Sequence, residues 1–244
     1  MAAALLLWLF PLTASFARDY QPQQAIAAAV QALGNGGTVT IEGEPLASRI
    51  VLPALYQANN DVPLWSNPRA IDQLLTAIRT IDREGLLPAD YHLTALDALQ
   101  QRMAAGKDTA SPELTADFDL LLTDSLVRLG YHLAFGKVDP EALDPDWNLR
   151  RQIEQPETVS RLDDAIHNGH IDALLASVRP TLPSYTRLIT ALQEYRHIAT
   201  QGGWQSVPAG PSLKPGMTGA RVMALRHRLA ASGDLSGEKT LLMK

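Results

Sequence analysis

Residue types that can act as nucleophiles are sparse in this sequence. None of the 244 residues is cysteine, so the chain has no thiol for nucleophilic or redox chemistry. Ser236 and Lys239 form an S-x-x-K pattern, which is the nucleophile motif of penicillin-binding proteins and class A β-lactamases. That chemistry also needs S-D-N and K-T-G segments, and neither occurs here. The sequence therefore indicates no catalytic residue.

Histidine side chains raise the question of a metal site. His167 and His170 stand three residues apart, but the Asn-Gly pair between them is expected to end a helix there. We therefore interpret both as solvent-exposed turn residues, and we predict no metal site and no cofactor site. Tyr131 and His132 are interpreted as packing residues with polar tips.

Asp119 and Asp124 fall within the longest predicted helix, residues 111–136. Asp119 and Asp124 are five residues apart, which places them too far round a helix to act as a pair. The same helix carries a continuous apolar stripe, as expected for a helix buried in the middle of a bundle. We expect the two carboxylates to flank this stripe, which consists of Phe118, Leu122, Leu126, Leu129 and Leu133 and is widened by Leu121 and Val127.

Helical periodicity governs most of the remaining chain, and one stretch, residues 38–46, alternates like a strand. Ser48 is predicted to be a helix N-cap, with Ile50 directed toward the core. Asn67 and Ser111, each followed by proline, are predicted to begin two further helices. The predicted helices cover residues 21–33, 48–60, 67–87, 111–136, 156–169, 170–180 and 184–203, with a short one inside 213–235.

The composition is that of an ordinary globular chain, with 46% hydrophobic and 19% charged residues. A formal net charge of -5 at pH 7 provides no electrostatic attraction to nucleic acid or to an anionic membrane surface. We therefore predict neither as a partner.

Residues 1–17 form an apolar run of signal-peptide length that ends in Ser-Phe-Ala, which fits a cleavage site. The run is shorter than the ~20 apolar residues that a membrane-spanning helix needs. It contains no Lys or Arg, so the alternatives to cleavage and export are a membrane anchor formed by the uncleaved segment, a misplaced start codon and a buried N-terminal helix.

Six phrases follow one another along the rest of the chain: PLWSN (63–67), GLLPADYHL (85–93), DLLLTDSLVRLGYHLAFGKVDP (119–140), LDPDW (143–147), YTRLITALQEYRHIATQGGW (185–204) and VPAGPSLKPGMTGARVMALRHRLAASGDL (207–235). In this order and spacing they closely resemble the non-catalytic N-terminal half of the large murein L,D-transpeptidases of Gram-negative bacteria. The resemblance covers nearly the whole chain after residue 17.

In that family a helical scaffold domain precedes a small peptidoglycan-binding-like domain of helical hairpins and a β-rich catalytic domain. The resemblance implies a mainly α fold, with a helical bundle scaffold and a minor β element over residues 18–206. Residues 207–244 would then form a linker and an incomplete peptidoglycan-binding-like segment. In that segment Val222, Leu225 and Leu229 recur at helical spacing and resemble the inward face of a hairpin whose second half is expected to be missing.

The catalytic step of the family uses a cysteine thiolate activated by histidine, within a Ser-His-Gly-x-Cys-Arg-like motif that this sequence lacks. The resemblance therefore implies a periplasmic, murein-associated scaffold portion of an L,D-transpeptidase, a family of cell wall biogenesis, without catalytic power of its own. One alternative is the N-terminal part of an active enzyme whose cysteine domain is encoded downstream. The other is an independent periplasmic protein-binding module.

Contacts to peptidoglycan or to an envelope protein are predicted on the last helix. Arg221, Arg226 and Arg228 give it a basic side that suits anionic cell-wall carboxylates, although a solvated helix face explains the same residues. Leu225 and Leu229 are the residues expected to meet a partner helix.

Overall fold

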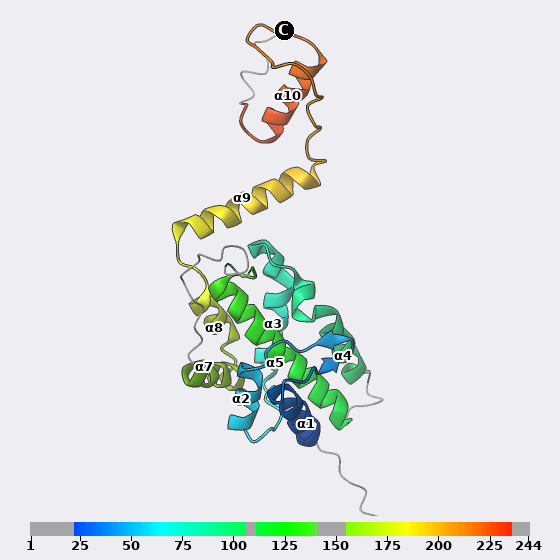
Figure 1. Ribbon diagram of the computed structural model, residues 1–244, viewed down its shortest axis with the longest axis vertical. Helices are drawn as coiled ribbons and strands as arrows, with labels where there is room; N and C mark the ends of the chain where they lie inside the picture. Colours follow the sequence, from blue (N-terminus) through cyan, green and yellow to red (C-terminus); the bar gives the residue numbers. More distant parts are fainter. Residues whose placement is uncertain (1–21, 106–110, 139, 141–154, 236–244) are drawn as a thin grey trace, which may run out of the picture. The chain divides into compact units, whose positions relative to one another are not determined.

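The computed structural model describes residues 22–105, 111–138, 140 and 155–235, and these form helices with one small two-stranded sheet (Figure 1). The predicted fold class, mainly helical with a minor β element, is confirmed. Three predicted features lie outside the described residues: the leader at 1–17, the phrase at 143–147, and Ser236 with Lys239. Among the residues described, no helix combines the length and apolar character needed to cross a membrane.

The chain divides into two compact units, each assembled from separate stretches of sequence. Unit 1 takes its described residues from 1–71, 94–127 and 153–170, and unit 2 takes them from 72–93, 128–152 and 171–244. The division between the units falls within α3 (Pro68–Thr80) and α5 (Pro112–Phe135), and it also separates the first residue of α4 (Leu93–Ala104) from the rest of that helix.

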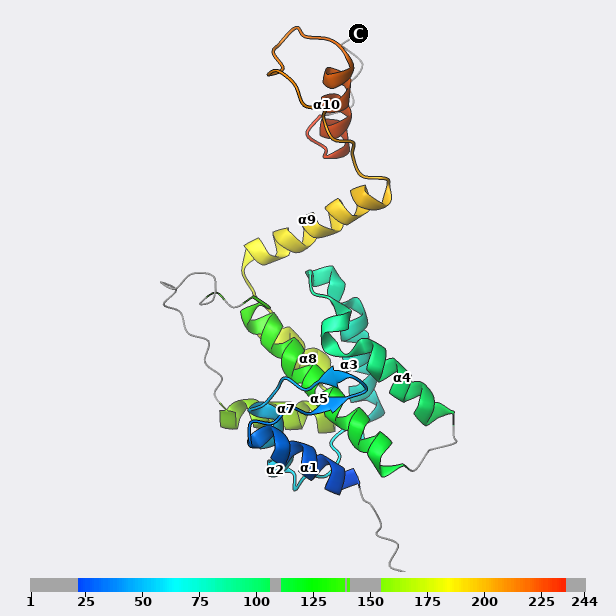
Figure 2. The ribbon, with the colours of Figure 1, turned by 45° about the vertical axis from the view of Figure 1, so that its right-hand side comes forward.

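Unit 1 contains helix α1 (Pro22–Gly34), helix α2 (Val51–Ala58), nearly all of α4 (Leu93–Ala104), the first part of α5, and α7 (Gln155–Asn168). Helix α2 contacts both α1 and α7 (Figure 2). Each of these helices buries apolar side chains, and α5 contributes the most. The core includes Ile26, Val30, Leu33, Leu52, Leu55, Leu96, Leu99, Leu121, Leu122, Leu126, Leu162 and Ile166.

The β element is a tight hairpin and not the single strand predicted for residues 38–46. Strand β1 (Thr40–Ile41) pairs antiparallel with β2 (Glu44–Pro45), with Thr40 opposite Pro45 and Ile41 opposite Glu44. The two residues between the strands, Glu42 and Gly43, have φ of 50° and 84°. Positive φ at both central positions is the conformation that two-residue hairpins need. The alternating pattern of residues 38–46 therefore spans both strands and the turn between them.

Two of the three predicted helix starts are confirmed. The Asn67 side chain accepts a hydrogen bond from the backbone N–H of Arg69 at 3.0 Å, and the Ser111 hydroxyl accepts one from the N–H of Leu114 at 3.4 Å. Both satisfy N–H groups that a first helical turn leaves without partners.

The third predicted start was wrong. Helix α2 begins at Val51 without a side-chain cap, and Ile50 is 64% exposed and does not point into the core. The backbone N–H of Ser48 is instead bound by Asp124, as described below, and this contact fixes where the chain enters α2. Helix α4 was not predicted at all, although Ala95, Leu96 and Leu99 have helical spacing.

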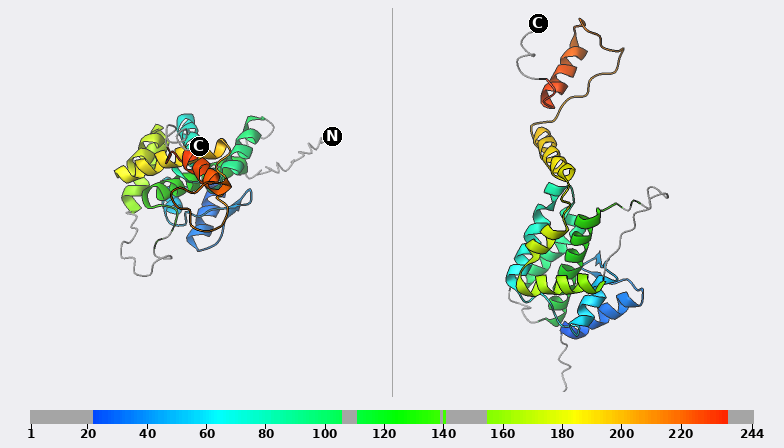
Figure 3. Two further views of the ribbon diagram at one scale, coloured as in Figure 1. Left: turned by 90° about the horizontal axis from the view of Figure 1, so that it is seen from above. Right: turned by 90° about the vertical axis from the view of Figure 1, so that its left-hand side faces the viewer.

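Unit 2 contains most of α3, the end of α5, two short 3-10 helices, and helices α8 to α10. The 3-10 helices are η1 (Ile81–Glu84) and η2 (Pro88–Tyr91). Helix α8 (Ile171–Val178) buries two side chains, whereas α9 (Pro183–Thr200) and α10 (Ala220–Ala231) bury none. Helix α9 contacts η1. The segment that precedes α10 runs back alongside it (Figure 3).

Gly169 ends α7 with a φ of +66°, as the Asn-Gly pair predicted. A Cβ at this position would lie 3.1 Å from the Asn67 amide nitrogen and 3.2 Å from the Arg69 Cδ. The same amide nitrogen donates to the carbonyl of His167 at 2.9 Å.

We expect Gly169→Ala to lower the free energy of unfolding by about 1–2 kcal/mol, because alanine is strained at positive φ and its methyl group crowds Asn67. Gly130→Ala is the matched control. Gly130 lies inside α5, where a Cβ would have nothing within 4 Å, so alanine should raise the stability by about 0.5–1 kcal/mol. Urea unfolding of both variants tests this, and equal effects would contradict it.

Candidate functional site

The residues predicted to contact murein or a partner lie on α10, and the structure gives one of them an internal role. The Arg221 guanidinium donates from Nε to the carbonyl of Pro208 at 2.9 Å and from Nη1 to the carbonyl of Pro211 at 2.8 Å. Arg221 therefore fastens the preceding loop to the helix. Two N–H donors of its guanidinium, on Nε and Nη1, are therefore already hydrogen-bonded within the chain.

Arg228 is also engaged within unit 2. Its guanidinium carbon lies 3.4 Å from the ring centroid of Trp204, a cation–π contact. The other neighbour of the indole is Tyr195, near the end of α9, whose ring meets it edge to face at 5.9 Å between centroids. Trp204 thus links α9 to α10, because its ring contacts Tyr195 of α9 and the Arg228 guanidinium of α10.

The apolar face of α10 is only partly covered. Val222, Leu225 and Leu229 are half-buried, and none of them reaches the burial of a core residue. Arg226 is half-buried as well. The predicted contact residues therefore do not form one uniform surface: Arg221 and Arg228 are bound internally, while Leu225 and Leu229 keep part of their apolar area exposed.

Asp119 and Asp124 do not flank the apolar stripe, and the sequence interpretation was wrong here. Both belong to the core of unit 1, where they are 4% and 0% exposed. Asp124 accepts hydrogen bonds from the backbone N–H groups of Ala47 at 3.0 Å and Ser48 at 2.7 Å. The physical reason is that backbone N–H groups in loops against the core need acceptors, and a carboxylate on a neighbouring helix supplies them.

Asp119 is the centre of a larger buried network. It accepts from the Tyr56 hydroxyl at 2.6 Å and from the backbone N–H groups of Leu64 at 3.0 Å and Trp65 at 2.9 Å. The Trp65 indole donates to the Thr123 hydroxyl at 2.9 Å, and that hydroxyl also lies 2.9 Å from the Tyr56 oxygen. Side chains from α2 and α5 and the loop before α3 are joined in this way.

Burial raises the pKa of Asp119, while its hydrogen bonds from Leu64, Tyr56 and Trp65 act in the opposite direction. Burial and the nearby Asp119 carboxylate raise the pKa of Tyr56 well above its usual value, so the phenol remains a donor. Titratable groups with shifted pKa values often mark a catalytic site. Here each partner of Asp119 is a structural donor, and the arrangement serves folding.

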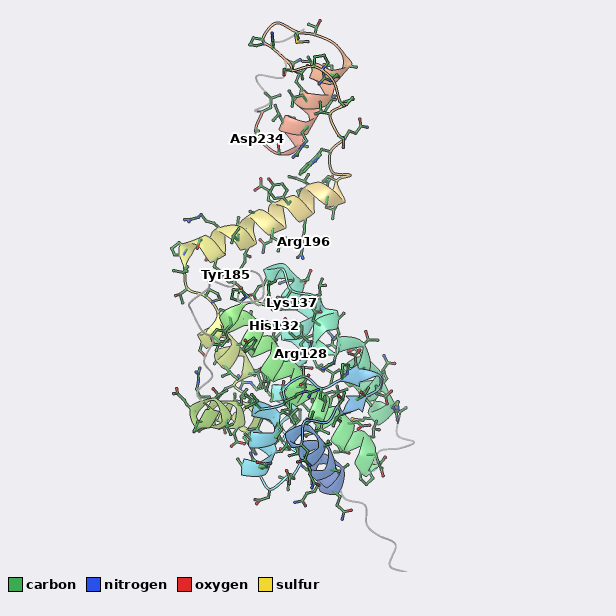
Figure 4. All side chains as sticks on the ribbon, viewed as in Figure 1. Arg128, His132, Lys137, Tyr185, Arg196 and Asp234 are labelled. Atoms are coloured by element: carbon green, nitrogen blue, oxygen red, sulfur yellow. The ribbon has the colours of Figure 1, made fainter. Side chains whose placement is uncertain are left out.

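A second polar cluster, in unit 2, was missed by the sequence analysis. Three consecutive residues of the GLLPADYHL phrase each pair with a residue in the C-terminal part of α5 or just after it. Figure 4 labels these partners, Arg128, His132 and Lys137. The pairs are Asp90 with Lys137 (2.6 Å), the Tyr91 hydroxyl with His132 Nδ1 (3.0 Å), and His92 Nε2 with Arg128 Nη1 (3.3 Å). The only signal in the sequence is the helical spacing of Arg128 and His132.

His92 and Tyr91 are buried in this cluster, and His92 adopts a left-handed conformation with φ of 56°. Burial raises the pKa of Tyr91 beyond its usual range, with Asp90 adding to the effect. Tyr131 packs against Phe135 with 5.1 Å between ring centroids. The interpretation of Tyr131 and His132 as packing residues with polar tips agrees with these contacts.

The two histidines considered as metal ligands are surface residues of unit 1. His167 lies 3.3 Å from the carboxylate of Asp163, one helical turn earlier, and His170 is exposed beyond the end of α7. Across the part of the chain that the structure describes, no three His, Cys, Asp or Glu side chains gather in a way that could hold a metal ion.

A family model described as a scaffold domain matches residues 51–192, more than half of the chain. The chain belongs to the scaffold-domain family. The match to the scaffold domain includes the Asp119 network and the pairs made by residues 90–92, and it ends within α9, before α10. No curated protein and no solved structure matches the chain.

We expect Asp119→Ala to lower the free energy of unfolding by about 3–5 kcal/mol, because it leaves the Tyr56 hydroxyl and two buried N–H groups without an acceptor. Asp119→Asn keeps one acceptor oxygen and should cost less. Asp72→Ala, at an exposed position of α3, should stay within about 0.5 kcal/mol of wild type. Urea unfolding monitored by circular dichroism compares the three, and a small effect of Asp119→Ala would contradict the structural role.

The raised pKa of Asp119 also predicts a pH dependence. The folded protein holds the Asp119 proton up to a higher pH than the unfolded chain, where the pKa is about 3.9. Stability contributed by this group therefore falls as the pH rises from about 4 through the folded-state pKa. The unfolding free energy of wild type minus that of Asp119→Asn should decrease over this window. A difference that increases with pH would contradict the shift.

Proposed function

We propose that this chain is the non-catalytic scaffold portion of a murein L,D-transpeptidase, exported to the periplasm and associated with the cell wall. The observation that carries the proposal is that phrases resembling this family supply the contacts that hold the scaffold domain together. Leu64 and Trp65 of PLWSN donate to Asp119 of DLLLTDSL, and Asp90 to His92 of GLLPADYHL pair with RLGYHLAFGK.

The chemistry available to these 244 residues supports a structural role. Cysteine is absent from the sequence, and the family reaction proceeds through a cysteine thiolate. In the described residues the buried carboxylates, Asp119 and Asp124, are occupied by backbone N–H groups. We therefore assign any transpeptidation to a cysteine domain outside this sequence, and the scaffold's task is to hold such a domain or the cell wall in place.

Association with murein is proposed to involve α10, on which Arg226 lies close to the half-covered apolar residues Leu225 and Leu229. The stem peptides of murein carry carboxylates, which suit guanidinium groups. The resemblance of residues 207–235 to a peptidoglycan-binding-like domain supports the same region.

Cosedimentation with purified sacculi tests this proposal. The full chain should pellet with sacculi, and the Arg226→Glu variant should lower the bound fraction at least fivefold, because the charge that meets the cell-wall carboxylates is reversed. Arg83→Glu, an exposed arginine on η1, is the matched control and should bind like wild type. If the wild type stays in the supernatant, or if all three bind equally, α10 does not bind murein.

The half-covered face of α10 also favours the alternative of a protein-binding module. In that case Leu225→Glu with Leu229→Glu should abolish capture of an envelope partner and leave the melting temperature of the scaffold unchanged. A drop in the melting temperature would show that the face packs within the chain.

Reading the gene beyond the codon for Lys244 tests the remaining alternative, the N-terminal part of an active enzyme, because such an enzyme requires a downstream Ser-His-Gly-x-Cys-Arg-like motif.

A further inference from the structure

Helix α9 is an 18-residue helix without a single buried side chain. Most helical stability in proteins comes from packing of an apolar face. One side of α9 contacts η1. The remaining apolar surface of α9 is a candidate interaction surface.

The packed stripe is held largely by polar contacts. The Tyr185 hydroxyl donates to the Glu84 carboxylate, and the Arg196 guanidinium binds Asp82. Leu192 lies close to Gly85, which follows η1: a Cβ placed on Gly85 would be 3.6 Å from the Leu192 Cδ2. These residues lie on one side of α9 and hold that side against η1. Figure 4 labels Tyr185 and Arg196 along this side. The opposite side of the helix therefore faces away from η1.

The neighbouring stripe is apolar and open. Leu188 is 69% exposed and Tyr195 is 55% exposed, although Tyr195 also touches Trp204. The two are seven residues apart, with the small residue Ala191 between them, so they lie on one face of the helix. In heptad terms Leu188 and Tyr195 occupy one core position and Ala191 the other.

Two opposite charges stand beside this stripe. Arg187 and Glu194 each precede one of the exposed apolar residues, are both exposed, and share the flank of α9 away from the η1 contact. In the described part of the chain neither side chain makes an ion pair or hydrogen bond. The stripe therefore carries a positive charge at one end of its flank and a negative charge at the other.

This face of α9 is self-complementary when two copies of the helix pack antiparallel. A second copy of α9 running antiparallel about a two-fold axis near Ala191 would set Leu188 against Tyr195 of the second copy. The same axis brings Arg187 against Glu194 of the second copy, and it does so twice. In a parallel pair this flank would face the opposite flank of the other helix, and these ion pairs would not form.

We propose that the chain self-associates as a two-fold symmetric dimer through the Leu188–Tyr195 stripe of α9, with the helices antiparallel and Arg187 paired to Glu194 of the second copy. The occupant of the open stripe is thus another copy of this chain. The contact spans about two heptads and is smaller than a standard protein interface, so the association is weak. The proposal is independent of murein binding.

Sedimentation equilibrium of the full chain from about 10 µM to about 1 mM measures this association. The wild type should shift from monomer to dimer within the range. Arg187→Glu and Glu194→Arg should each weaken the dimer at least tenfold, because each sets like charges together at both ends. Arg83→Glu serves as the charge-reversal control outside α9 and should associate like wild type.

The decisive sample is an equimolar mixture of the Arg187→Glu and Glu194→Arg chains. Each charge on one chain then meets its opposite on the other, so the mixture should dimerise as strongly as wild type while each variant alone does not. The double variant should recover as well. Loss of folding would be seen as a changed urea midpoint and would not produce recovery on mixing. A monomeric wild type throughout the range, or a mixture that fails to recover, would overturn the proposal.

Discussion

Buried backbone donors set the central constraint on unit 1. The loop that leads into α3 is buried at Leu64 and Trp65, and the loop that leads into α2 is partly buried at Ser48. The N–H groups of both loops need acceptors that neither a helix nor a sheet provides. Asp119 and Asp124 meet this need from a single helix, α5. A carboxylate is costly to bury unless it is fully hydrogen-bonded, and the raised pKa of Asp119 reflects that cost. The packing of α1, α2 and α7 is built around loops whose course these two side chains determine.

Unit 2 is held together differently. Its inner part has an apolar core that includes Leu74, Ile78 and Leu129, but its outer helices are attached through side-chain pairs. Glu84 accepts from Tyr185 and Arg179, and Asp82 accepts from Arg196. Such contacts at partly exposed positions are individually weak. Helices α9 and α10 bury no side chain, and both carry exposed apolar residues, among them Leu188, Tyr195 and Met223.

Signals that act over one or two helical turns were predicted well from the sequence. The caps at Asn67 and Ser111, the end of α7 at Gly169, and the buried stripe of α5 each depend on neighbours within a few residues. The predictions failed where a distant residue decides the outcome. Ser48 resembles an N-cap, yet Asp124, 76 residues away, binds its N–H. The candidate site was limited in the same way, because nothing near Arg221 or Arg228 in the sequence indicated that Pro208, Pro211 and Trp204 would engage them.

The Arg221 contacts also change the effective length of the tether between α9 and α10. By residue count, positions 201–219 separate the two helices, which corresponds to a contour of about 65 Å if fully extended. With the carbonyls of Pro208 and Pro211 bound to Arg221, only residues 201–207 lie between α9 and the segment that Arg221 holds, a contour of about 25 Å. A shorter tether confines α10 to a smaller volume and so raises its local concentration near anything bound at α9. A single arginine within a helix thereby sets the reach of the segment that precedes it.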